Sequence, residues 1–435
     1  MTESRRSQYR WWIVIGCIVC AASMWVYVNR VLIAYQVDDA AAHDRPRGNL
    51  SDLYPRWLGA RELLLRGRNP YGVDVTREIQ EGYYGRVLDP SRRGDPHDQA
   101  GFAYPVYVVF FLAPSVRFPF PVIQRLFFWL LLVITSGTTI LWLRVVRWAQ
   151  PVWAQLSLIA LTLGSIAAMQ GLKLQQISLL VAGLIAAAIV LLIYDHAALA
   201  GILLAMASVK PQLVLLLLAW LAIWMMGDWR KRYGLATSFL VSMAILCAVS
   251  EWYLPHWIRL FWQAVRQYQN YAENTSVLDG LIGKPWSWFF EIAAAAALLN
   301  ACWRERRNKA DTERFGFTVS MILAGTILLI PTSAQYNQVL LIPALLMIVK
   351  ERRLIWGRGV LHRAFLLMTI ILTVWPWVSA GVLAGLSFVL PPPAIERAWA
   401  VPLWTTVQTP VMVAALMLFH YYQGTFGASR EAGTS

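Results

Sequence analysis

The protein is a chain of 435 residues, of which 58% are hydrophobic and only 14% are charged. A water-soluble chain would expose too much apolar surface with this composition, which therefore indicates a polytopic membrane protein. The net charge is +14, but the basic residues gather in short runs between apolar segments, as the orientation bias of membrane insertion produces. We expect membrane lipids as partners and no nucleic acid.

The first membrane-length segment is residues 11–28, which contain no charged residue. At about 1.5 Å per residue a helix there covers roughly 27 Å, enough for one span. The preceding residues 1–10 are basic like the start of a signal peptide, but no small-residue cleavage pattern follows. We predict a cytoplasmic tail at 1–10 and a retained transmembrane helix at 11–33.

An amphipathic helix is predicted just after this anchor, in the stretch SDLYPRWLGARELLLRGRNPYG (51–72). Its approximate apolar face consists of Trp57, Leu58, Leu64 and Leu65. Gly67 is placed to end the helix, and such a helix lies flat on a membrane surface. Pro55 is tolerated only in a first turn, so Asp52 comes close to the N-cap. One explanation of Asp52 is therefore a helix cap.

Further membrane-length segments follow along the chain. They are about 120–146, 151–168, 176–194, 197–226, 234–252, 286–302, 315–331, 336–350, 361–383 and 401–422.

Short basic loops set the expected orientation of these spans. DWRKRY (228–233), WRERRNK (303–309) and KERR (350–353) should be cytoplasmic, together with both termini. Residues 34–103 and 253–285 then form external loops. The helices of 286–423 complete the membrane part, and 424–435 form a cytoplasmic tail.

Residues 104–226 allow two interpretations. In the first, 104–117 spans the membrane and 197–226 is one tilted helix. In the second, 104–117 is a shallow re-entrant piece and 197–226 is two short helices meeting near Lys210. The second is favoured because it places RVVR (144–147) inside. Both give an all-α fold of about twelve transmembrane helices.

A family resemblance is reached at the stretch after the first span. Its pattern there consists of Asp52, Tyr54, Ala60, Leu63, Gly67, Asn69, Pro70 and Tyr71. This pattern resembles the first external loop of glycosyltransferase family 87, integral-membrane enzymes of GT-C type that include polyprenyl-phosphate-mannose-dependent mannosyltransferases. Further segments resemble the family in order: FAYPVYVVFFLAP (102–114), QQISLL (175–180), GILLAMASVKPQLVLLLL (201–218), NTSVLDGL (274–281) and SAQYNQVLLIPAL (333–345). Two of them depart from it, with Val106 in a Tyr-Pro-Pro segment and Gln175 where Gly is common.

The resemblance implies an inverting transferase in the cell membrane, with its active site on the external face. The enzyme would move a sugar, with mannose expected, from a polyprenyl phosphate to a hydroxyl of a lipid or glycan acceptor. Residues 34–103 would be the catalytic loop with amphipathic helices, and 104–252 would be the GT-C-like core.

The resemblance assigns the general base to Asp52, an acidic residue early in this external loop. A single carboxylate is enough, because a lipid phosphate leaves without a strong general acid and only the acceptor proton must be taken. The rivals Asp38, Asp39 and Asp44 lack the Tyr54 and Asn-Pro-Tyr context.

Lys210 is the candidate for binding the donor phosphate, because a cation lowers the barrier by stabilising the departing charge. An ionisable residue inside an apolar run is costly and therefore suggests a functional site, and Pro211 favours a helix break there. The alternative is that Lys210 snorkels or pairs with a buried carboxylate. Arg56 and Arg61 are further candidates for a phosphate or an acidic lipid.

Neutral groups suited to sugar or acceptor hydroxyls complete the candidate site. They are Tyr54, Asn69, Tyr71, Tyr104, Gln175, Gln176, Asn274, Tyr336, Asn337 and Gln338. No metal or other cofactor is expected, since Asp95, His97 and Asp98 in RRGDPHDQ (92–99) are typical of a solvated turn.

A non-enzymatic secondary transporter or lipid carrier is the alternative function, with Lys210 as its binding charge. Such a protein should show internal hydropathy symmetry and midplane polar residues. The acids and aromatics of this chain instead gather in the external loop, which favours an enzyme.

Overall fold

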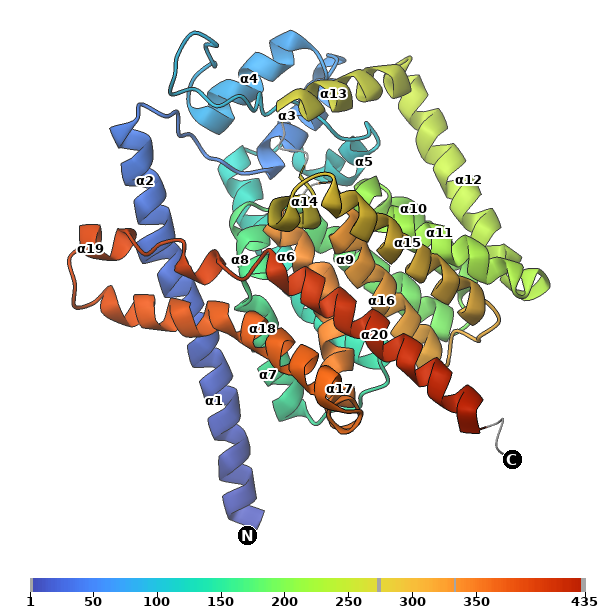
Figure 1. The fold of residues 1–435 in the computed structure, drawn as a ribbon. Coiled ribbons are helices and arrows are strands. Elements are labelled where there is room, and N and C mark those ends of the chain that lie inside the picture. Colours follow the sequence, from blue (N-terminus) through green and yellow to red (C-terminus); the bar gives the residue numbers. More distant parts are fainter. Residues whose placement is uncertain (1–2, 272–274, 332–333, 432–435) are drawn as a thin grey trace.

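The computed structural model describes residues 3–271, 275–331 and 334–431, and within these ranges every regular element is helical (Figure 1). This agrees with the all-α prediction. The first elements are α1 (Glu3–Tyr27), the π-helical η1 (Val28–Leu32), α2 (Ile33–Ala42), α3 (Leu53–Arg66), α4 (Val73–Tyr84), α5 (Val108–Leu112) and η2 (Ala113–Ser115). The middle of the chain forms α6 (Phe120–Val145), α7 (Val152–Leu163), α8 (Ile166–Lys173), α9 (Ile177–Ile193), α10 (Ala197–Ala207), α11 (Pro211–Met226) and α12 (Trp229–Tyr253). Then come α13 (Trp257–Tyr271), α14 (Val277–Ile282), α15 (Trp286–Glu305), α16 (Glu313–Leu329) and η3 (Gln335–Leu341). The last are α17 (Ile342–Gly357), α18 (Val360–Leu386), α19 (Pro392–Glu396), η4 (Val401–Leu403) and α20 (Gln408–Glu431).

Several helices are long and apolar enough to cross a membrane. Among the described residues there are five such stretches, or six if the bent pair α7 and α8 is one span. They are Arg10–Ala42, Phe120–Val145, Trp229–Tyr253, Val360–Leu386 and Pro392–Gly424. The apolar helices α9, α10 and α11 are shorter. The chain is therefore a multi-pass membrane protein, and the count of about twelve spans stays a prediction.

The first helix is longer than the sequence indicates. It runs without interruption from α1 through η1 into α2, so that the stretch Arg10–Ala42 has 33 residues. The helix continues past the predicted boundary at residue 33, because Ile33–Ala42 is itself a regular helical segment, with no glycine or proline to stop it. The loop predicted to be external consequently begins after Ala42.

Two breaks inside apolar segments shape the site. Residues 197–226 form α10 and α11, which meet at Lys210, and Pro211 begins the second helix, as the favoured interpretation expects. Residues 104–117 likewise form only the short α5 and η2. The segment predicted as one span at 151–168 is broken, since α7 and α8 meet at a bend of 61°. The Ser165 hydroxyl caps α8 by accepting from the Ala168 amide.

The core of the bundle is built around α9 and α16. Most residues of both helices are buried, and α9 packs against α6 and α10 while α16 packs against α11, α15 and α20. A further boundary differs from prediction, because 336–350 begins as the 3₁₀ helix η3 and becomes α17 only at Ile342. This change of helix type brings the start of η3 against α8 and α9.

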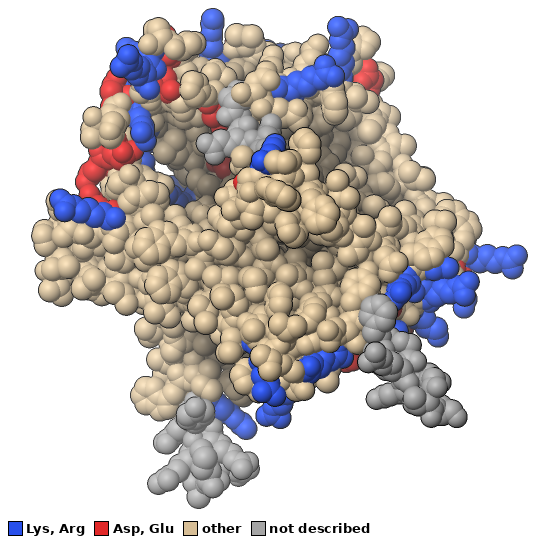
Figure 2. Space-filling model, viewed as in Figure 1, with Lys and Arg blue, Asp and Glu red and all other residues tan. Residues whose placement is uncertain are grey.

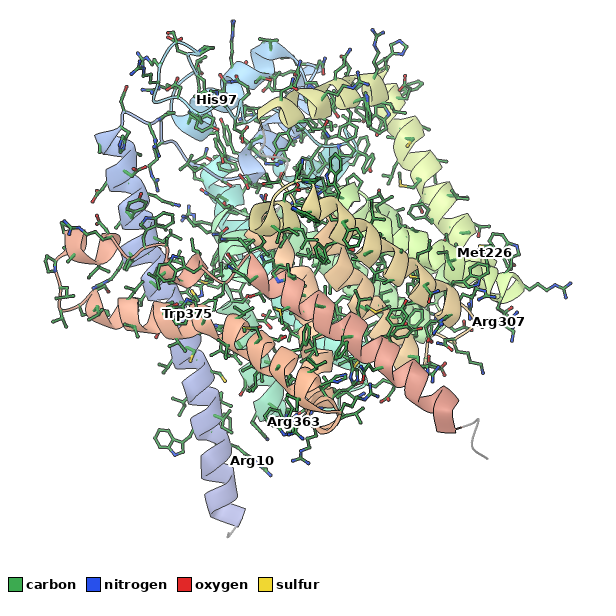
Figure 3. All side chains as sticks on the ribbon, in the orientation of Figure 1. Arg10, His97, Met226, Arg307, Arg363 and Trp375 are labelled. Atoms are coloured by element: carbon green, nitrogen blue, oxygen red, sulfur yellow. The ribbon has the colours of Figure 1, made fainter. Side chains whose placement is uncertain are left out.

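The two ends of the molecule carry different elements. In Figure 1, α3, α4 and α13 lie at one end, and the N-terminus lies at the other. Figure 3 places His97 at the first end, whereas Arg10 and Arg363 lie at the opposite end. The loop predicted to be external thus lies at one end of the bundle.

Candidate active site

Asp52 lies directly before α3 but does not cap it. Its side chain makes no capping hydrogen bond. Instead the Tyr83 phenol donates to Oδ1 over 3.1 Å and the Gln176 amide donates to Oδ2. Its own backbone N–H donates to the Leu174 carbonyl over 2.9 Å. The capping explanation is therefore wrong, because the carboxylate turns toward the bundle.

The Tyr83 hydroxyl is a donor that stays protonated. Burial, and after it the charge of the Asp52 carboxylate, raises the pKa of this phenol well above its usual value. Tyr83 lies near the end of α4, which Gly85 terminates in a left-handed conformation at φ +82°. This α4 residue therefore holds one oxygen of Asp52 in place.

Lys210 is buried at the break between α10 and α11, with 4% of its surface exposed. Its ammonium donates to the Ser178 hydroxyl over 2.5 Å and to Gln176 Oε1 and Asn337 Oδ1 over 3.3 Å each. It also lies 4.7 Å from the centre of the Tyr336 ring. Among the described residues no carboxylate contacts it. Lys210 therefore neither snorkels nor forms a buried ion pair.

Gln176 joins the acid to the cation. Its amide nitrogen donates to Asp52 and its amide oxygen accepts from Lys210, so both ends of one side chain are used. Gln176 precedes the first turn of α9 and is 2% exposed. A carboxylate and an ammonium from separate parts of the chain are thus held one amide apart.

Arg56 adds a second positive charge, one turn along α3 from Asp52. Its guanidinium lies 4.3 Å from the centre of the Tyr104 ring and donates to the Asp52 carbonyl. The Tyr104 phenol interacts electrostatically with both Arg56 and Lys210. Tyr104 is therefore in contact with Arg56 at this site.

Gln175 points away from this cluster although it neighbours Gln176. Its backbone is left-handed at φ +50°. Its Oε1 accepts from the Ser51 hydroxyl over 2.6 Å, and its Nε2 donates to the carbonyls of Leu172 and Lys173 over 2.8 Å each. Because protein groups occupy both ends of its amide, Gln175 fixes the chain before Asp52.

Other predicted residues support the site from outside. Tyr71 donates to the Tyr104 carbonyl over 2.6 Å, and Asn69 accepts from the Tyr71 amide over 3.0 Å. Tyr54 packs edge-on against Phe120 with ring centres 4.8 Å apart. These contacts position the Asn-Pro-Tyr turn and the start of α3.

Three further predicted residues lie apart from the cluster. The Arg61 guanidinium lies 5.4 Å from the centre of the Trp57 ring. Gln338 donates to the Thr406 carbonyl over 2.7 Å, on the side of α20. Asn274 lies outside the described residues.

The segment RRGDPHDQ is a turn in which Asp95 and Asp98 are held by hydrogen bonds and an ion pair. Asp95 pairs with Arg86 and accepts from the Asp89 amide, and this backbone hydrogen bond lowers the pKa of its carboxyl. Asp98 accepts from the Ala100 amide over 2.8 Å. Burial raises the pKa of Asp98, and the charge of Asp52 adds to the effect. Asp98 is therefore part of the electrostatic surroundings of Asp52. Across the described chain, no three His, Cys, Asp or Glu side chains form a group that could hold a metal ion.

Sequence reasoning missed the residues that connect the site. Tyr83 belongs to none of the matched segments, and Ser178 lies in QQISLL but was not singled out; their roles depend on contacts between distant parts of the chain. Glu62 was also missed, although it is 1% exposed and pairs with Arg66 and Arg68 beneath α3. The available signal was the position of Glu62 on the buried face of the helix, followed in the sequence by Arg66 and Arg68.

Comparison with known proteins gives one match. The family model of glycosyltransferase family 87 matches residues 102–331, which include Tyr104, Gln176 and Lys210 but begin after Asp52. No curated protein and no solved structure matches the chain. The match covers more than half of the chain and names the same family as the resemblance does. The chain belongs to glycosyltransferase family 87 and is a membrane glycosyltransferase.

Proposed function

We propose that the protein transfers a sugar, mannose, from a polyprenyl phosphate to a hydroxyl of a lipid or glycan acceptor, with inversion at the anomeric carbon. The observation that carries this proposal is the Asp52–Gln176–Lys210 arrangement, in which one amide holds the carboxylate beside the ammonium. A base and a phosphate-binding cation are the two groups that such a transfer needs.

Asp52 is the general base in this mechanism. The acceptor oxygen attacks the anomeric carbon while its proton moves to the Asp52 carboxylate. The bond from the anomeric carbon to the phosphate oxygen breaks, and its electron pair stays on the polyprenyl phosphate. Hydrogen bonds from Tyr83 and Gln176 hold the carboxylate in one orientation, as a base that must meet a hydroxyl requires.

Lys210 and Arg56 stabilise the negative charge on the departing phosphate. Lys210 is buried and has only neutral hydrogen-bond partners among the described residues, so its charge is available to an anion. Arg56 stacks on Tyr104 beside it. In a site of low polarity such preorganised cations act more strongly than they would in water. Ser178 and Asn337 hold the ammonium in place.

The site faces the outside of the cell in this proposal. The candidate site lies at the end of the bundle that carries α3, α4 and α13, away from Arg10 and Arg363 (Figures 1 and 3). Basic residues favour the cytoplasmic side of membrane proteins. The termini are then cytoplasmic and the lipid-linked donor is used at the external surface.

The test is transfer of radiolabelled mannose from decaprenyl- or undecaprenyl-phosphate mannose to a membrane lipid extract by the purified protein. Asp52→Asn should lower the rate by about 10²–10⁴-fold, the usual contribution of a positioned base. Asp44→Asn is the matched control, because Asp44 is another acid of the same loop and is 82% exposed. Equal rates for the wild type and Asp52→Asn would exclude Asp52 as the base.

A further inference from the structure

A cavity of about 460 Å³ lies beside Asp52, between the first helical stretch and the external loop. Its polar wall includes Gln36, Arg45, Arg47, Tyr83, Gln170 and Lys173. Ligand pockets in proteins have volumes of about 300–1,000 Å³, so a lipid headgroup fits. Figure 2 shows the surface hollowed on the α2 side, with Lys and Arg as well as Asp and Glu side chains around the hollow.

The cavity has an excess of positive charge. Its only acidic lining residue is Asp39, whose carboxylate is already paired with Arg45 over 2.6 Å. Lys173 donates to the neutral Gln36 over 3.0 Å and contacts no carboxylate within the described chain. The Arg47 side chain makes no hydrogen bond or ion pair with the described residues. Two half-buried cations therefore remain without a counter-charge.

Arg47 and Lys173 line the same cavity, so their charges face one space. Like charges near each other in a partly buried site are unfavourable, and an anion between them would remove the repulsion. Phosphate oxygens suit this arrangement because an arginine guanidinium and a lysine ammonium both donate charge-assisted hydrogen bonds to them. The cavity thus has the chemistry of a phosphate-binding site.

The cavity reaches Asp52 from a different side than Lys210 does. Tyr83 lines the cavity and donates to Asp52, and Leu174 lines it and accepts from the Asp52 amide. Lys210 is linked to the same carboxylate only through Gln176, which does not line the cavity. In an inverting transfer, the acceptor hydroxyl attacks the anomeric carbon on the face opposite the departing donor phosphate. Two separate phosphate sites, one for the donor and one for the acceptor, would allow this geometry.

The floor of the cavity is apolar and continuous with a membrane span. Val28, Leu32 and Ile33 line it, and all three belong to the stretch Arg10–Ala42, which is long and apolar enough to cross a bilayer. The acyl chains of a lipid whose headgroup sits in the cavity would run along this helix. A soluble anion would gain nothing from such a floor.

We propose that this cavity binds the phosphate-bearing headgroup of the acceptor lipid, with Arg47 and Lys173 holding the phosphate and the hydroxyl-bearing part directed past Tyr83 toward Asp52. The inference rests on the proposed function, because it takes a membrane lipid to be the acceptor.

Binding of short-chain lipids to the purified full-length protein tests this proposal without requiring turnover. The probes are dioctanoyl phosphatidylinositol, which is anionic, and dioctanoyl phosphatidylcholine, which has no net charge. We expect the wild type to prefer the anionic lipid, and Arg47→Gln and Lys173→Gln each to weaken its binding by about tenfold, the usual effect of losing one charge-assisted hydrogen bond. The matched control is Arg93→Gln, an exposed arginine of the same external loop, which should bind as the wild type does.

Four outcomes would overturn the proposal. The first is equal binding of the two lipids by the wild type, and the second is unchanged binding by a folded Arg47→Gln/Lys173→Gln double variant. In the third, glycerol phosphate binds as tightly as the lipid, so the site takes a free phosphate. In the fourth, undecaprenyl phosphate displaces the anionic lipid, so the site belongs to the donor. If instead anionic binding depends on Arg47 and Lys173 but no mannose is transferred, the proposed reaction fails while the headgroup site stands.

Discussion

Two buried cations, Lys210 and Arg232, are held in the bundle in opposite ways. Arg232 is 8% exposed and donates to the backbone carbonyls of Trp224, Arg306 and Asn308, while it stacks 3.7 Å from the centre of the Trp224 ring. Both Nη atoms are directed at main-chain carbonyls near the α11–α12 and α15–α16 connections. Arg232 therefore stabilises the fold at that end of the molecule.

Lys210 is held by side chains rather than by the backbone. Its partners Gln176, Ser178 and Asn337 come from α9 and η3, and each can rotate when a ligand arrives. A bound phosphate could replace these neutral oxygens without breaking any helix. The comparison teaches that burial of a cation alone does not mark a site, whereas burial with only exchangeable neutral partners does.

The largest expected effects come from mutating these two cations, which should change the transfer rate and the stability in opposite ways. Lys210→Met should lower the transfer rate by about 10²–10³-fold through lost phosphate stabilisation, while thermal unfolding stays at or above the wild-type temperature because a costly buried charge is removed. Arg232→Met should do the reverse and destabilise the fold by about 3 kcal/mol, since buried carbonyls lose their donors. Transfer assays and thermal unfolding in detergent check both. A loss of stability without a loss of rate in Lys210→Met would contradict the comparison.

A smaller effect is expected from the amide that joins acid and cation. Gln176→Leu removes the donor to Asp52 and an acceptor of Lys210, so we expect the rate to fall by about 10–100-fold. As a positioning residue, Gln176 should affect kcat more than the donor KM. Gln338→Leu is the control, because Gln338 donates only to the Thr406 carbonyl among the described residues. A fall in rate of the same size in both variants would exclude the bridging role.

A methyl group added at Gly82, next to the Tyr54 side chain, should have a moderate effect on stability. A methyl group at Gly82 would lie 2.0 Å from the Tyr54 phenol oxygen, so Gly82→Ala must shift either α4 or the Tyr54 ring. We expect a loss of about 1–3 kcal/mol, as overpacking usually causes, together with a slower transfer because Tyr83 moves. Gly137→Ala in α6 is the matched control, since its methyl would meet nothing within 4 Å. Equal stability of Gly82→Ala and the wild type would contradict this packing.

The smallest effect concerns two acids of the external loop with opposite pKa shifts. The pKa of Asp98 is raised by burial, so its contribution to stability is present at acid pH and is lost as pH rises through its folded pKa. The pKa of Asp95 is lowered by the Asp89 amide, so its contribution is present at neutral pH and is lost as pH falls.

At neutral pH, thermal unfolding should therefore show Asp98→Asn slightly more stable and Asp95→Asn less stable than the wild type. Both differences should shrink as the pH falls toward the range in which the carboxyls are protonated. A greater stability of Asp95→Asn at neutral pH would show that the sign is wrong.

Local signals predicted the parts of the fold that depend on neighbouring residues. Gly67 ends α3 in a left-handed conformation at φ +65°, and Pro211 begins α11 after the break at Lys210. The bend between α7 and α8 also had a local signal that was not used, the Gly164–Ser165 pair. A methyl at Gly164 would lie 2.5 Å from the Ala21 Cα, so the close approach of α1 requires glycine there.

The connections within the site could not be predicted in the same way. The sequence and its family resemblance indicated Asp52, Gln176 and Lys210 separately. That Gln176 bridges the other two, while Gln175 turns away, depends on a left-handed backbone at Gln175 and on contacts across the bundle. No spacing rule contains such information. Which of two adjacent polar residues faces a site is settled by tertiary packing.

The most direct test of the central claim is a structure of the protein with an uncleavable polyprenyl-phosphonate sugar and an acceptor lipid. The account predicts the acceptor hydroxyl about 3 Å from the Asp52 carboxylate, within hydrogen-bonding reach of a general base. It also predicts the phosphonate oxygens in contact with Lys210. An anomeric carbon more than about 10 Å from Asp52, too far for a near-attack geometry, would contradict it.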